Sequence, residues 1–169
     1  MLSRIYKEKS RSQTFRERCL FVADIYLGLR RQAEENKSKL NFFTKTELEE
    51  HEYVPDPLPD AYIATEEKKE TKRYFLEIIS DQLPRFVLRN RIEYLFEYYD
   101  SQVWQEKTNH PFPTILMICP NYVIRGFLSK FITQTLENEG SEISFYLTTK
   151  DQIEALGMKP TIWEKVVEE

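Results

Sequence analysis

Two carboxylate side chains on either side of a charged loop are the residues of this sequence that could do chemistry. Asp60 follows a proline at the start of one apolar segment, and Glu77 lies inside the next, in the run YFLEII at residues 74–79. If these segments are the two strands of a hairpin, Asp60 and Glu77 become neighbours. Two neighbouring carboxylates can hold Mg²⁺ against a phosphodiester. An unpaired buried carboxylate is costly, so Glu77 needs a partner or a ligand.

Glu77 also admits a structural interpretation that involves no metal. It could face solvent at a strand end, or pair with an arginine of the following helix, such as Arg89 or Arg91. Two further acids, Glu47 and Glu49, precede the proline-rich segment and could approach as a third ligand. The residues alone leave the metal site and the structural ion pair open as alternatives.

Apolar spacing and helix-boundary residues predict the elements that must position these carboxylates. Apolar residues three and four apart from Phe15 to Ala33 predict an amphipathic helix at about 15–35, and a similar stripe predicts a long helix at about 84–107. Asn121 is a candidate N-cap and Gly140 a candidate terminator of another helix. Strands are expected at 40–43, 60–65, 73–80, 114–119 and 142–148, and a short helix at 149–157.

The predicted order α-β-β-β-α-β-α-β-α belongs to the α/β class. Three consecutive strands, a crossover helix and a fourth strand imply a mixed β-sheet with a helix on each face. The charged residues between the strands at 60–65 and 73–80 are typical of a hairpin tip. The nearly apolar run at 74–79 favours a central strand covered on both faces.

Length and composition are those of one folded domain with a basic arm. The chain has 169 residues, of which 41% are hydrophobic and 14% aromatic, enough for one core at about residues 14–169, with residues 1–13 as the arm. Cys19 and Cys119 show no metal-site spacing, and reduced thiols are expected. There is no apolar run of membrane length and no hydrophobic signal region. We therefore expect a soluble, cytoplasmic protein with no membrane partner.

The net charge of −4 does not indicate a nucleic-acid binder, but the distribution of charge leaves an anionic partner open. Residues 1–31 carry eight basic side chains against three acids, whereas the last nineteen residues are acidic. A basic end on an acidic body could be an arm for DNA phosphates, or only a solvated tail and helix face. The candidate DNA contacts are Arg4, Lys7, Lys9, Arg11 and Arg16, with Arg89 and Arg91 on the helix after Glu77.

Six short segments between residues 20 and 154 resemble the replication-relaxation family of plasmid and mobile-element proteins. The segments are FVADIYLGLRRQAEE, LPDAYI, RYFLEI, RIEYLFEYYDSQVW, FPTILMICPN and SFYLTTKDQI. The resemblance implies a restriction-endonuclease-like core with the PD-(D/E)XK pattern. It also implies DNA as a partner, a relaxase or replication protein as a second partner, and Mg²⁺ as the cofactor that Asp60 and Glu77 would hold.

Two departures from that family matter, one for DNA binding and one for catalysis. Family members usually carry a winged-helix domain in front, and we expect none here, since about a dozen residues precede the first predicted helix. Active nucleases have a lysine two residues after the glutamate, and this chain has Ile79, which cannot stabilise charge. Asp81 could be a displaced acid, but it does not replace a cation. Three interpretations follow: a DNA-processing accessory with a vestigial site, an active Mg²⁺-dependent endonuclease with an altered site, and a protein-interaction domain.

Overall fold

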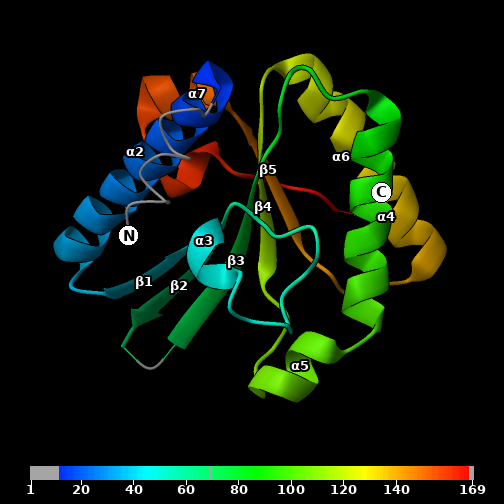
Figure 1. Ribbon diagram of the computed structural model, residues 1–169, viewed down its shortest axis with the longest axis horizontal. Helices are drawn as coiled ribbons and strands as arrows, with labels where there is room; N and C mark the ends of the chain where they lie inside the picture. Colours follow the sequence, from blue (N-terminus) through cyan, green and yellow to red (C-terminus); the bar gives the residue numbers. More distant parts are fainter. Residues whose placement is uncertain (1–11, 69, 168–169) are drawn as a thin grey trace.

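The computed structural model describes residues 12–68 and 70–167 of the chain (Figure 1). Four of the candidate DNA contacts, Arg4, Lys7, Lys9 and Arg11, lie outside the described residues. The elements in chain order are α2 (Gln13–Asn36), β1 (Lys39–Thr44), α3 (Lys45–Leu48), β2 (Ala61–Glu67), β3 (Glu70–Ile78), α4 (Arg85–Asp100), α5 (Val103–Thr108), β4 (Thr114–Cys119), α6 (Tyr122–Glu139), β5 (Phe145–Thr149), α7 (Lys150–Leu156), the 3₁₀-helix η1 (Pro160–Ile162) and β6 (Glu164–Lys165).

Within the described residues, the strands form one six-stranded mixed sheet in the order β1-β2-β3-β4-β5-β6. The junctions β1/β2, β2/β3 and β5/β6 are antiparallel, and β3/β4 and β4/β5 are parallel. The predicted mixed α/β sheet is therefore confirmed, with the β2–β3 hairpin inside it. Four strands, β1, β3, β4 and β5, end at one edge of the sheet, which we call the carboxyl edge.

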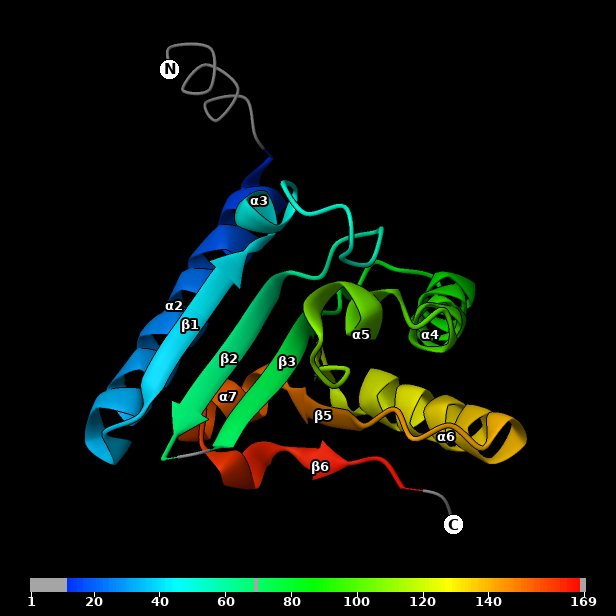
Figure 2. The ribbon, with the colours of Figure 1, turned by 90° about the horizontal axis from the view of Figure 1, so that it is seen from below.

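Helices cover both faces of the sheet, and each face has its own apolar layer (Figure 2). One layer joins α4, α5 and α6 to the sheet, and the other joins α2 and α7 to it. The side chains of β3 and of Ile79, which follows it directly, alternate between the layers, with Phe75 and Ile79 in the first and Leu76 and Ile78 in the second. All four are at most 5% exposed, so β3 is covered on both faces, as expected of a central strand.

The prediction of one long helix at 84–107 is wrong in one respect, because the segment forms two helices, α4 and α5. Gln102 adopts a left-handed conformation (φ 58°) between them. The break turns the indole of Trp104 into the first apolar layer, where it lies 5.1 Å from the Phe75 ring and is only 3% exposed. Its Nε1–H donates to the Pro111 carbonyl at 3.1 Å. Burial of a large ring thus overrides the helical periodicity of the segment.

The ends of α6 form as predicted. The Asn121 side chain accepts a hydrogen bond from the Ile124 amide at 3.0 Å, and Gly140 closes the helix in a left-handed conformation (φ 58°). The predicted stripe of α2 is only partly buried, because the helix meets its apolar layer from Phe21 onward and leaves Phe15 and Cys19 exposed. No helix in the described part of the chain is long and apolar enough to cross a membrane.

Candidate functional site

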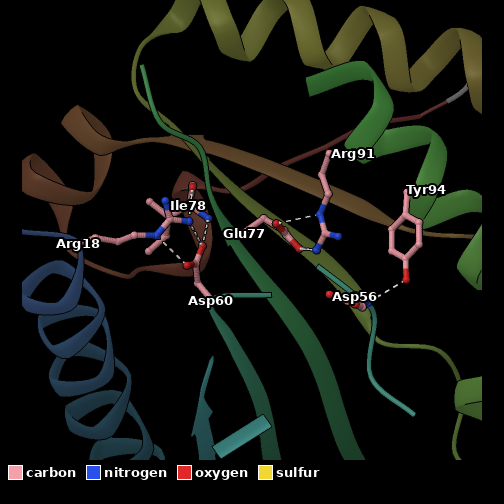
Figure 3. A network of polar contacts seen from close by, with 7 residues as sticks. All are labelled: Arg18, Asp56, Asp60, Glu77, Ile78, Arg91 and Tyr94. Carbon is pink, nitrogen blue, oxygen red and sulfur yellow. Dashed lines mark hydrogen bonds and ion pairs between the residues drawn. The ribbon is translucent and has the colours of Figure 1, made fainter. Parts of the chain in front are cut away.

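The β2–β3 hairpin brings Asp60 and Glu77 to the carboxyl edge (Figure 3). Ala61 pairs with Leu76 in the register, so Asp60 lies just before β2, beside the end of β3. The backbone holds it there, because its amide donates to the Leu76 carbonyl at 2.8 Å and its carbonyl accepts from the Lys45 amide at 3.1 Å. The neighbour relation that the sequence predicts for the two carboxylates therefore follows from an ordinary antiparallel register.

Asp60 is paired with an arginine of α2. The Arg18 Nε and Nη2 groups donate to Oδ1 and Oδ2 at 2.8 and 2.6 Å, a bidentate geometry. The Ile78 amide also donates to Oδ2 at 2.7 Å, and Arg18 Nη2 donates to the Ile78 carbonyl at 2.8 Å. Asp60 is 7% exposed, whereas the Arg18 side chain is 40% exposed. The carboxylate is thus fully engaged, and only its cation reaches solvent.

Glu77 is paired with an arginine of α4, as the structural interpretation of the sequence allowed. Arg91 Nε donates to Oε2 at 3.3 Å, and Nη2 forms a closer bond with Oε1. Both side chains are nearly enclosed, at 10% and 13% exposed. Burial raises the pKa of Glu77 above its ordinary value, the Arg91 cation opposes that rise, and the nearby Asp60 charge adds to it.

The two carboxylates turn toward different helices, and each is bound by its own arginine. Figure 3 shows Asp60 directed at Arg18 and Glu77 directed at Arg91 on the other side of β3. Of the other candidate acids, Glu47 accepts bonds from the Thr44 amide and hydroxyl at 2.7 Å each, which lower its pKa. Among the described residues, no three acidic, histidine or cysteine side chains gather in a way that could hold a metal ion.

The position of the nuclease lysine is part of the apolar layer. Ile79 is 4% exposed and packs in the same layer as Leu88 and Ile92 of α4. Its side chain shares the face of β3 on which Glu77 meets Arg91. The segment between α3 and β2 also contacts α4, since the Asp56 amide donates a hydrogen bond to the Tyr94 hydroxyl at 2.8 Å (Figure 3). The site therefore contains two guanidinium groups, those of Arg18 and Arg91, and each is already paired with a carboxylate.

The described DNA-contact candidates separate into two kinds. Arg16 and Arg89 are exposed, and Arg89 lies over the Phe127 ring at 5.5 Å. Arg91 is a poor DNA contact, because Glu77 neutralises it and its side chain is 13% exposed. From the sequence, Arg18 is only one of the eight basic side chains of residues 1–31, and its pairing with Asp60 is missed. One signal could have indicated its position: Arg18 lies four positions before Val22, and therefore on the helix face that packs on the sheet.

No protein-family model, curated protein or solved structure matches the chain. The resemblance to the replication-relaxation family and to the PD-(D/E)XK pattern therefore rests on the sequence segments quoted above. Function has to be argued from the site itself, as for any fold that can host several activities.

Proposed function

We propose that this chain is a DNA-processing accessory protein of the replication-relaxation kind, with a nuclease-like site that does not cleave. The observation that carries the proposal is the pairing of both candidate metal ligands with arginines, Asp60 with Arg18 and Glu77 with Arg91. The mixed sheet and its element order are compatible with the restriction-endonuclease-like core that the sequence resemblance implies. On this proposal the site stabilises the fold, and the working surface binds DNA or a relaxase or replication partner.

The chemistry of phosphodiester cleavage explains why these pairs argue against activity. A Mg²⁺ ion needs free carboxylate oxygens, and here each carboxylate already accepts two bonds from a guanidinium. Binding a metal would require displacing a bidentate partner from a buried oxygen pair. The missing lysine adds a further loss, since one positioned charge-stabilising group commonly contributes about 10²–10³ in rate. Ile79 supplies no such charge.

DNA binding is supported by the electrostatics of the carboxyl edge. The helices α4 and α6 each follow a strand that ends there, and the Arg18–Asp60 contact brings the first turns of α2 to the same edge. Figure 1 shows the starts of these three helices along one side of the molecule. Their aligned backbone dipoles favour anions, and Arg16 and Arg89 add exposed positive charge. Phosphates of a DNA backbone fit such an edge.

The decisive experiment combines a cleavage assay with a binding assay on the same preparation. We expect no nicking of supercoiled plasmid with Mg²⁺ or Mn²⁺, and DNA binding that weakens steeply as salt rises. Robust metal-dependent cleavage that Asp60→Ala abolishes would instead establish the active endonuclease. Absence of DNA binding at low salt would leave the protein-interaction domain as the correct interpretation.

The basic arm can be tested separately by deleting residues 1–11, which leaves Ser12 in place as the N-cap of α2. The deletion removes Arg4, Lys7, Lys9 and Arg11 against one acid, Glu8. If all four basic residues contact phosphates, the slope of log affinity against log salt should fall by about 3.6, at ~0.9 per phosphate. An unchanged slope would show that the arm takes no part in DNA binding.

A further inference from the structure

The facing parts of α4 and α6 carry a concentration of positive charge in an acidic chain. Residues 80–92 and 120–131 contain five basic side chains and one acid, Asp81. Arg91 is neutralised by Glu77, and Arg125 pairs with Glu164 at 2.8 Å. Arg85 and Arg89 have no carboxylate within ion-pair distance in the described part of the chain. Lys130 is exposed and likewise forms no ion pair within the described residues, so three uncompensated cations remain, of which Arg85 and Arg89 lie beside aromatic rings.

Aromatic rings hold these two cations in place. The Arg85 guanidinium lies 5.0 Å from the Phe127 ring centroid, and the Arg89 guanidinium lies 5.5 Å from Phe127 and 5.7 Å from Phe131. The two phenyl rings are themselves stacked, with centroids 6.5 Å apart. Cation–π contacts orient the guanidinium groups without neutralising them. The pair is thus positioned for an external anion.

The starts of the same two helices expose aromatic side chains. Adjacent ends of β3 and β4, where the Ile79 amide donates to the Ile118 carbonyl at 2.9 Å, place α4 and α6 next to each other. Figure 2 shows the two helices side by side on one face of the sheet. Phe86 in the first turn of α4 is 64% exposed, and Tyr122 in the first turn of α6 is 53% exposed. Arg125 lies 5.0 Å from the Tyr122 ring.

From this combination we propose that Arg85, Arg89, Phe86 and Tyr122, here called the α4–α6 surface, bind single-stranded DNA. The proposal rests on the DNA binding proposed above and specifies its substrate class. Phosphates satisfy the unpaired guanidiniums, and unpaired bases can stack on exposed rings. The bases of a duplex are already stacked on one another and cannot use the rings. An acidic peptide would use the cations alone.

The test is fluorescence anisotropy of the full chain with a labelled single strand and with its duplex, over a range of salt. We expect the single strand to bind at least tenfold more tightly than the duplex. Phe86→Ala with Tyr122→Ala should weaken single-strand binding by roughly tenfold per ring and leave duplex binding unchanged. Phe43→Ala is the matched control, because Phe43 is 39% exposed on the distant strand β1.

A charge variant tests the other half of the surface. Arg85→Ala with Arg89→Ala should lower the salt slope for the single strand by about 1.4, at ~0.7 per phosphate contact. Arg30→Ala with Arg31→Ala removes the same charge near the far end of α2, and should leave the slope unchanged. Circular dichroism and thermal melting of each variant check that the fold is retained.

Four outcomes would overturn the inference. Equal affinity for single strand and duplex, or no effect of the ring substitutions, would refute it while leaving the proposed DNA binding intact. Equal competition by polyglutamate would show a general polyanion site, which fits an acidic protein partner. Failure to bind either form of DNA would refute the inference together with the DNA-binding part of the proposed function.

Discussion

Replacing Arg91 with methionine is the sharpest test of how the candidate site is held together. Methionine keeps a long side chain at this position of α4 but leaves Glu77 without its cation. Glu77 is 10% exposed and Arg91 13% exposed, so water cannot replace the lost bonds. Removing one partner of such a pair costs about 3–5 kcal/mol, because an uncompensated charge stays buried. That is a large part of the stability of an ordinary domain, roughly 5–15 kcal/mol.

The loss should depend on pH in a defined direction. Burial already raises the pKa of Glu77, and Arg91 opposes that rise, so the variant should raise this pKa further. A carboxyl group whose pKa is higher in the folded state stabilises the fold while it is protonated, and this contribution is lost as pH rises through the folded pKa. The difference between variant and wild type should therefore be largest at neutral pH and shrink in mildly acidic solution.

Urea unfolding followed by circular dichroism, at neutral and at mildly acidic pH, measures both effects. Arg18→Met is the matched comparison, and a smaller loss of about 1–2 kcal/mol is expected because Arg18 is 40% exposed and Asp60 keeps its bond from the Ile78 amide. The reasoning is refuted if Arg91→Met costs less than about 1 kcal/mol at neutral pH, or if its effect is the same at both pH values.

Three further outcomes are expected. Ile79→Lys should lower stability by several kcal/mol, since the ammonium would enter an apolar layer, and should gain no nicking activity, since Glu77 is already paired with Arg91. A melting curve measures the stability, and a supercoiled-plasmid assay measures the nicking. In the native protein a maleimide should label Cys19, which is exposed, and spare Cys119, because burial raises the pKa of that thiol to about 12; equal labelling of both would contradict this. Asn121→Ala should cost about 1 kcal/mol through loss of a helix cap, seen as a lower denaturant midpoint.

The hairpin, the central strand and the ends of α6 could be predicted from the sequence because each depends on local chemistry. An apolar run such as residues 74–79 must be covered on both faces wherever it lies, and Asn121 and Gly140 act within one turn of their own helix. The charged tip of the hairpin also implied the antiparallel register, which sets Asp60 beside the end of β3. To that extent the location of the candidate site was a property of the sequence.

The partners at the site were decided only by the tertiary structure. Arg18 and Asp60 lie 42 positions apart, and nothing local to either residue indicates the other. The sequence allowed both a metal site and an ion pair for Glu77, and the side of β3 on which α4 packs, with Arg91 facing inward, selects the ion pair. The break at Gln102 has a similar origin, since burying Trp104 against strands distant in sequence outweighs the helical preference of the segment. Local propensity acts over a few residues, whereas the free energy of desolvating a charge or a ring depends on everything that surrounds it after folding.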